Sequence, residues 1–361
     1  MPLKHLPALL VCASMVLLLV MGDTAADAVS ASLELCVTRV IPPLFPYMVL
    51  SSVILSLDLL RPLYRFIPTE KWFGMPRCAA PVLLTGFICG FPVGASGAAR
   101  LVRDKKLSPE NAAKLCAVSS AASPAFVIGT VGQWWTKEYG IILWLTQVLT
   151  SLLLAVTVFR SDCPSGSIAA DDKPPAQSAT ECLCDAVSSA ARSCLNVTAY
   201  ITFFGTAAVL LSALLPPLAP LFSAALEFSR GASFGARIGG LYGIILTGAA
   251  VGFSGISVLM QTASFLIPAG VSVRPTVCAH LAVMSVSAAV SALYYLFRLP
   301  ASSPVPASGS IFSPSAGFFV ISALGMLIFF GNRGSESKKH TEKHKSMRKS
   351  RCKKAEFRLP Y

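Results

Sequence analysis

The sequence predicts an all-α polytopic membrane protein made of two repeats, with about eight transmembrane helices. Its mean hydropathy is +0.66, and 54% of its 361 residues are hydrophobic while only 13% are charged. Soluble domains carry nearly twice that share of charged residues, so the soluble globular class is excluded. In addition, two apolar segments interrupted by glycines lie on either side of a polar loop, so each repeat is expected to contain a re-entrant or discontinuous helix.

The chain begins with an uncharged run from residue 6 to 21 after Lys4. We interpret residues 1–22 as a first transmembrane helix or a signal anchor. Residues 24–40 have charged margins and apolar positions at helical spacing, which is typical of an interfacial amphipathic helix. A membrane span is expected over 42–60.

The first glycine-broken segment covers residues 79–99 and lies between two basic stretches. Basic connectors face the cytoplasm, and one crossing cannot join two cytoplasmic ends. A re-entrant hairpin of two half-helices is therefore predicted, and one kinked crossing is the alternative. Ordinary spans over 112–132 and 141–159 complete the first repeat, residues 23–159.

The second half follows a polar loop at 160–191, and its repeat covers 192–298. The chain ends with a linker and last span at 299–331 and a tail at 332–361. Within the second repeat we expect a span at 196–215, a proline-punctuated surface stretch at 216–230, a broken segment at 238–268 and a span at 276–297.

The tail carries 11 of the 30 Lys and Arg residues against three acids. Basic segments beside a span are retained at the anionic inner leaflet, so the tail is expected in the cytoplasm. Seven crossings with Lys4 inside would place the tail outside. An odd number of crossings conflicts with a cytoplasmic tail, so the number must change by one. The simplest change is that residues 238–268 cross the membrane fully, which gives eight crossings.

The two broken segments are similar to each other. Leu84-Thr85-Gly86 and Gly90-Phe91 recur as Leu246-Thr247-Gly248 and Gly252-Phe253 with the same gap. Weaker matches flank this pair on both sides. Transporter folds are commonly built of inverted repeats, which favours a duplication.

Helix breaks point to a central binding site, because free backbone groups are too costly to face lipid. A break that lines a wet cavity offers half-helix ends and carbonyls to a solute. Close helix packing through glycines is an equally good explanation. The candidate substrate-binding residues are Thr85, Gly90, Pro92, Gly94, Ser123, Thr247, Gly252, Ser254, Gln261 and His280.

Nothing in the sequence indicates an enzyme, a cofactor or a metal site. The ionisable residues of the predicted spans are Asp58, Lys114 and His280, and no nucleophile–base pair or metal-binding motif is evident. Asp58 suits an interfacial ion pair better than a proton relay, and Lys114 suits a snorkelling side chain. His280 suits a satisfied structural histidine better than a ligand.

Several motifs resemble a known family. They are Ile41-Pro42-Pro43-Leu44-Phe45-Pro46-Tyr47, Gly90-Phe91-Pro92-Val93-Gly94-Ala95, Ser123-Pro124-Ala125-Phe126 and Gly252-Phe253-Ser254-Gly255. Their order over residues 30–300 resembles the YlbJ family of sporulation integral membrane proteins, in the nucleoside-recognition or Gate domain group. That group is distantly similar to concentrative nucleoside transporters with paired re-entrant hairpins. The resemblance implies an endospore-forming bacterium and a role in making a resistant spore, with a nucleoside-like solute only by analogy.

Two functions remain open at this point. A transporter or gate would move a small polar solute past the two breaks, and a membrane scaffold would use the loop and the tail to organise spore-envelope assembly. The expected partners are the lipid bilayer of the cell membrane, a small polar solute and other sporulation membrane proteins. Nucleic acid is not expected, because the basic charge belongs to the tail.

Overall fold

The computed structural model describes residues 6–57, 67, 69–160 and 178–298, and every regular element in these ranges is a helix. Five helices are long and apolar enough to cross a membrane, or six if the bent pair at the N-terminus is one span. The predicted class, an all-α polytopic membrane protein, is therefore confirmed. The last predicted span and the basic tail lie outside the described residues, as do Asp58 and most of the polar loop.

The N-terminal part forms two helical segments that meet at 96°. After α1 (Leu6–Val20), α2 (Gly22–Leu35) continues through a π-helical turn, η2 (Cys36–Val40), into α3 (Ile41–Ser56). A helix is present at 24–40 as predicted, but it does not end before the span expected at 42–60, because the chain stays helical from Gly22 to Ser56. Prolines 42 and 43 donate no backbone hydrogen bond, and the wider π turn just before them accommodates that loss.

The first glycine-broken segment is a hairpin of two short helices, α5 (Ala79–Cys89) and α6 (Val93–Arg103). They follow a one-turn helix, α4 (Thr69–Phe73). Gly97 on α6 packs against Val82 on α5, so the two helices run back along each other. Gly90 makes the turn with a φ of +77°, a conformation that favours glycine. The structure thus has the predicted hairpin rather than one kinked crossing.

The next helix is itself broken, which the sequence analysis did not predict. It runs from α7 (Pro109–Ser119) through a non-helical stretch to α8 (Pro124–Phe126), η4 (Val127–Val131) and α9 (Gly132–Trp134). Pro124 supplies no N–H, and Ser123 caps the new helix by accepting a hydrogen bond from Phe126 N at 3.3 Å. A long helix, α10 (Lys137–Thr157), closes this half.

The second half opens with a helix of 36 residues, α11 (Ala179–Leu214). Ser178 and Glu181 form a capping box that fixes its start. The C-terminal part of the predicted polar loop is therefore helical, and the span expected at 196–215 is only the second part of α11. The loop prediction failed here because charged residues on the first turns of α11 interrupt the pattern of apolar residues by which a helix is recognised.

The predicted surface stretch at 216–230 is instead part of a second hairpin. After η5 (Pro216–Leu218), α12 (Ala219–Leu226) and α13 (Phe228–Ile238) meet at Glu227, whose side chain is completely buried. The surface assignment fits the exposed residues 216–218 and was wrong for the rest, because short, proline-rich half-helices resemble loops in composition.

A second broken helix follows this hairpin. It consists of α14 (Gly240–Phe253) and α15 (Gly255–Leu266), ends in η6 (Ile267–Ala269), and is followed by α16 (Arg274–Arg298). Residues 240–269 are straight enough to count as one candidate crossing. This agrees with the revision in which the segment crosses fully.

The order of long helix, hairpin, broken helix and long helix thus occurs in both halves of the described chain. Leu84–Phe91, however, lies in a hairpin, whereas the similar Leu246–Phe253 lies in a broken helix. The sequence match that suggested the repeat therefore pairs elements of different kinds. The structural counterpart of the tip at Gly90 is Glu227, and that of the break at Ser254 is 120–123.

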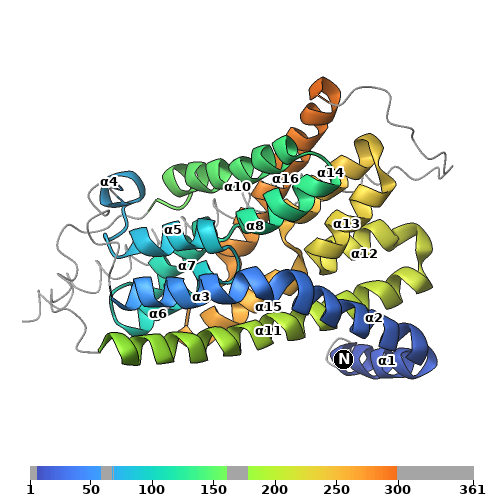
Figure 1. The fold of residues 1–361 in the computed structure, drawn as a ribbon, viewed down its shortest axis with the longest axis horizontal. Coiled ribbons are helices and arrows are strands. Elements are labelled where there is room, and N and C mark those ends of the chain that lie inside the picture. The colour runs from blue at the N-terminus through green and yellow to red at the C-terminus, as the bar shows by residue number, and fades with distance from the viewer. Residues whose placement is uncertain (1–5, 58–66, 68, 161–177, 299–361) are drawn as a thin grey trace, which may run out of the picture.

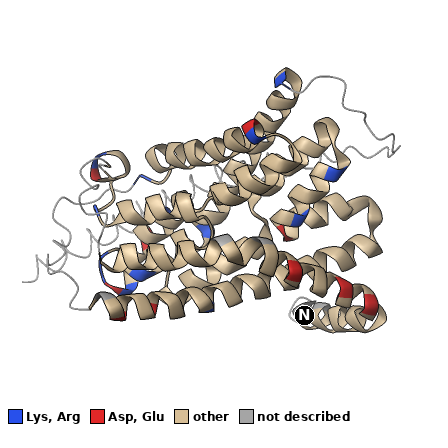
Figure 2. Ribbon diagram, viewed as in Figure 1, with Lys and Arg blue, Asp and Glu red and all other residues tan. Residues whose placement is uncertain are grey.

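Figure 1 shows how the hairpins are arranged: α5 and α6 lie at one end of the bundle, and α12 and α13 lie at the other. The helix α3 lies along the first hairpin, and the long helix α11 extends from that end to the second. Most charged residues belong to segments toward the two ends, and few belong to the middle (Figure 2). This distribution fits a bundle whose middle lies in the hydrocarbon layer.

The two halves share one packed interior through α10, α14 and α16. The hydroxyl of Tyr139 on α10 is 2.7 Å from the hydroxyl of Ser291 on α16 and donates to Ile244 O on α14 at 3.3 Å. Trp135 Nε1 donates to Thr247 Oγ1 at 3.2 Å. Buried hydrogen bonds of this kind hold the two halves in a fixed register.

The direction of the tail is a testable prediction. In a variant without native cysteines, a single cysteine at position 345 should resist an impermeant thiol reagent in intact cells and react after lysis, because the basic tail is retained inside. A cysteine in the 160–191 loop gives the reference for the same membrane. Labelling of position 345 in intact cells would contradict the eight-crossing arrangement.

Candidate functional site

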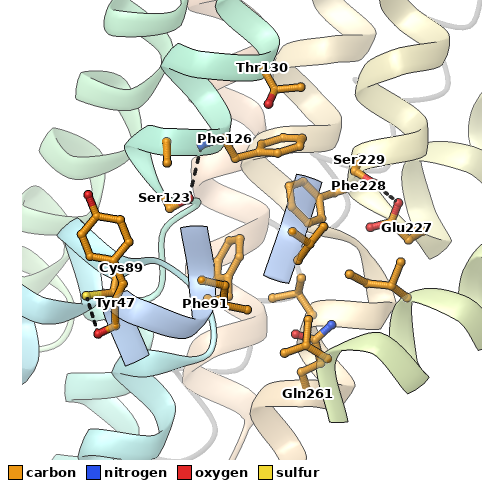
Figure 3. Close-up of a pocket in the computed structure, with 16 residues that line it drawn as sticks. Tyr47, Cys89, Phe91, Ser123, Phe126, Thr130, Glu227, Phe228, Ser229 and Gln261 are labelled. Carbon is orange, nitrogen blue, oxygen red and sulfur yellow. Dashed lines mark hydrogen bonds between the residues drawn. The ribbon is translucent and has the colours of Figure 1, made fainter. Parts of the chain in front are cut away.

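A cavity of about 90 Å³ lies where the two hairpin tips meet. The tip of the first hairpin contributes Phe91, the first helix break contributes Ser123, and the tip of the second hairpin contributes Glu227 (Figure 3). A buried water needs roughly 10–15 Å³ on such a measure, so the space suits several waters or a solute of a few heavy atoms. The lining residues are Val40, Leu44, Tyr47, Cys89, Phe91, Ser123, Ala125, Phe126, Thr130, Val197, Ile201, Glu227, Phe228, Ser229, Val258 and Gln261.

The first hairpin tip lies directly against the first helix break. A Cβ added at Gly90 would be 2.6 Å from Ser123 N, and one added at Gly94 would be 2.6 Å from Ser119 O. Only glycine permits backbones to approach this closely. The tip and the break thus form one wall of the cavity, with the Phe91–Pro92 peptide bond cis at the turn.

The second hairpin tip lies against the second break in the same manner. Gly255 begins α15 with a φ of +75°, and a Cβ there would be 3.0 Å from Phe228 N. Ser254, just before it, is in the left-handed conformation with a φ of +69°. This unusual conformation for a serine marks the break, and its hydroxyl donates to Val251 O at 3.3 Å.

Side chains satisfy part of the backbone that the breaks set free. The buried Gln147 on α10 accepts a hydrogen bond from Ala122 N at 3.1 Å through Oε1. His280 on α16 donates through Nδ1 to Phe253 O, at 3.0 Å. Each break thereby gains a side-chain partner, and the second ring nitrogen of His280, Nε2, is buried without a hydrogen-bond partner.

Three phenylalanines from three separate elements meet at the cavity. The ring of Phe228 lies edge-on to Phe91 at 5.9 Å and to Phe126 at 5.0 Å between centroids. Phe91 also contacts the ring of His280 at 5.8 Å. Figure 3 shows these rings between the two hairpin tips. Because each ring comes from a different element, a displacement of either hairpin would change the shape of the cavity.

The polar groups of the cavity are few and mostly uncharged. Glu227 Oε2 accepts hydrogen bonds from Ser229 Oγ at 2.5 Å and from Arg230 N at 2.8 Å, which caps α13. Gln261 Nε2 donates to Ser257 Oγ at 3.2 Å and leaves its carbonyl oxygen for other partners. Among the lining residues Glu227 is the one with a carboxyl group, and no Lys or Arg lines the cavity.

The structure brings some of the predicted site residues to the cavity and not others. Ser123 and Gln261 line it, and Gly90, Pro92 and Ser254 shape its hairpin tip and break. The remaining five do not line the cavity. Thr85 and Thr247 hydrogen-bond to backbone carbonyls, Gly94 and Gly252 pack against neighbouring segments, and His280 binds Phe253 O.

Sequence reasoning missed the second hairpin and therefore Glu227, Phe228 and Ser229. One signal could have found them: Glu227 is a lone acid between two short apolar stretches, at the place where the first half has its hairpin. The described residues contain no cluster of His, Cys, Asp and Glu that could hold a metal ion. Cys182 is buried and Cys184 is exposed on α11, and neither forms a disulfide.

A Gly90→Leu substitution should disable the site through its first wall. The new side chain would clash with the backbone of Ser123 and would strain the positive φ, so the tip should lift from the break. We expect loss of function in a complementation assay with normal membrane insertion. Gly129→Leu is the control, since nothing lies within 4 Å of a Cβ there.

Comparison with known proteins gives one distant relative. The sporulation integral membrane protein YlbJ of Bacillus subtilis (strain 168) is 28% identical over 128 residues, which are 33% of this chain and 30% of that protein. The match therefore spans less than a third of the relative's length and shows a distant relationship. No protein-family profile matches the chain. No solved structure matches it either.

Proposed function

We propose that this membrane protein binds a small polar solute in the central cavity and moves it across the membrane during spore formation. The observation that carries the proposal is that both hairpin tips and the first helix break contribute side chains to one cavity in the middle of the bundle. Transporters that alternate between two open states bind their solute between two repeats near the midplane, at broken helices.

The size and the lining of the cavity support a solute that is polar and compact. Its walls combine four aromatic rings with the hydroxyl, amide and carboxyl groups of Ser229, Gln261 and Glu227. Apolar walls with a few directed polar groups are typical of ligand sites. At about 90 Å³ the cavity would have to widen for a nucleoside, so a nucleoside-like solute requires a second, more open arrangement of the hairpins.

A role in sporulation rests on the relative, whose name describes a sporulation integral membrane protein. We expect deletion of the gene to leave vegetative growth unchanged and to lower the yield of heat-resistant spores. Spore counts before and after heating measure this, with the intact gene restored at another locus as the control. A deletion strain with normal heat resistance would remove sporulation from the proposal.

A membrane scaffold for spore-envelope assembly is the second candidate. The exposed apolar residues along α10 and α11, for example Leu149, Leu153 and Leu195, would then contact protein instead of lipid. Flux of labelled solutes, uridine among them, into vesicles containing the purified full-length chain distinguishes the two. A scaffold would show no flux above that of empty vesicles.

A further inference from the structure

Glu227 is the most unusual side chain of the cavity. It is a carboxyl group with no exposed surface, at the turn of the second hairpin, with Oε2 fully engaged by Ser229 and Arg230. Its other oxygen, Oε1, has no hydrogen-bond partner. Figure 3 shows Glu227 at the edge of the cavity, with its second oxygen directed away from Ser229.

No positively charged group lies within ion-pair distance of this carboxyl group. The ion pairs found within 4 Å among the described residues do not include Glu227. The nearest candidate, Arg230, lies three residues along α13. Its guanidinium donates to Ser32 Oγ at 2.8 Å and Ala28 O at 3.3 Å on α2 and so joins the hairpin to the N-terminal helix, while its Nε has no hydrogen-bond partner.

The other titratable groups around Glu227 place no cation against it either. Cys36 on η2 and Cys89 on α5 are buried thiols, and Tyr47 on α3 is a phenol across the cavity. His280 on α16 lies behind Phe91 and uses Nδ1 for Phe253 O. Arg237, at the far end of α13, lies over the ring of Phe234.

A buried carboxylate with a bare oxygen and no cation within ion-pair distance is unfavourable, and it is neutralised most easily by a proton. We propose that Glu227 is the proton-binding site of the central cavity, protonated on Oε1 in the closed arrangement seen here and deprotonated when the hairpins open the cavity to water. The proton comes from the aqueous phase, forms an O–H bond with Oε1, and returns to water when that bond breaks.

This inference rests on the proposed function for its consequence. Protonation makes the cavity neutral, and loss of the proton makes it anionic, so the charge of the site would change with each opening. Solute passage would then be coupled to proton movement. Acids inside membrane proteins are commonly functional groups of this kind.

The test uses the full-length protein in liposomes and needs no solute. Infrared spectra at neutral pH should contain the carbonyl stretch of a protonated carboxylic acid, shifted in D₂O, and Glu227→Gln should remove it. Glu181→Gln is the matched control, because Glu181 is exposed and glutamine also completes a capping box. Absence of the band in the wild-type protein would overturn the proposal, as would its persistence in Glu227→Gln.

A second measurement tests the release of the proton. Glutamine at 227 keeps an oxygen for Arg230 N but cannot ionise, so Glu227→Gln should fold and fail to restore heat-resistant spores, whereas Glu181→Gln should restore them fully. Full restoration by Glu227→Gln would overturn the release step. The infrared experiment and the flux experiment can fail separately. A protonated Glu227 in a protein without solute flux would refute the proposed function but would support the proton site.

Discussion

Ala125→Trp is expected to reduce heat-resistant spores to the level of the gene deletion. Ala125 is exposed and lines the cavity beside Phe126, so a large ring at this position would fill the space that a solute needs. Substitution of an exposed residue usually changes the free energy of unfolding by no more than about 0.5 kcal/mol. Loss of function should therefore occur without loss of folded protein.

The control for this experiment carries the same change elsewhere. Ala13 is exposed on α1 and does not line the cavity. Ala13→Trp should give normal spores, and both variants should elute from size exclusion in detergent as the wild type does. If Ala125→Trp complements the deletion fully, the central cavity is not the site of function.

Gly252→Leu is expected to unfold the protein rather than to block the site. A Cβ at this position would be 2.8 Å from Met284 Cα and 2.9 Å from Val283 O on α16. Backbone atoms of a packed helix cannot move aside cheaply, so the expected loss is about 3 kcal/mol or more. Yield in the membrane and the midpoint of thermal unfolding in detergent measure it.

Gly22→Leu provides the comparison, since no atom lies within 4 Å of a Cβ at Gly22. Its unfolding midpoint should stay close to that of the wild type. The sequence alone predicts a different outcome for Gly252→Leu, a stable protein with a blocked site. A well-folded but inactive Gly252→Leu variant would show that the packing of α14 on α16 tolerates more than the geometry allows.

Hydropathy and basic connectors predicted the membrane class and the first hairpin, because both follow from the free energy of placing apolar and charged groups in a bilayer. The same signals failed for α12 and α13. Half-helices of about ten residues are too short to give a hydropathy peak, and their prolines resemble those of a surface loop.

The cavity could be predicted only in part for a related reason. Ser123 and Gln261 lie next to recognisable motifs, so their polar side chains in apolar surroundings were noticeable. Glu227 and Phe228 reach the cavity only through the tertiary contact of the second tip with Gly255. The packing of helices determines such a contact, and no local pattern in the sequence records it.

The contact between each hairpin tip and the break of its own half has a consequence for biosynthesis. Gly90 meets Ser123 and Phe228 meets Gly255, and both pairs are close together in the chain. Contacts between nearby residues form early and need little loop closure, so each wall can assemble while its own half is being inserted. The cavity exists only after the two walls come together. If translation stalls before the second hairpin, the membrane contains a first half that is assembled but has no second half packed against it. Quality-control proteases can distinguish the surface left uncovered from the complete protein.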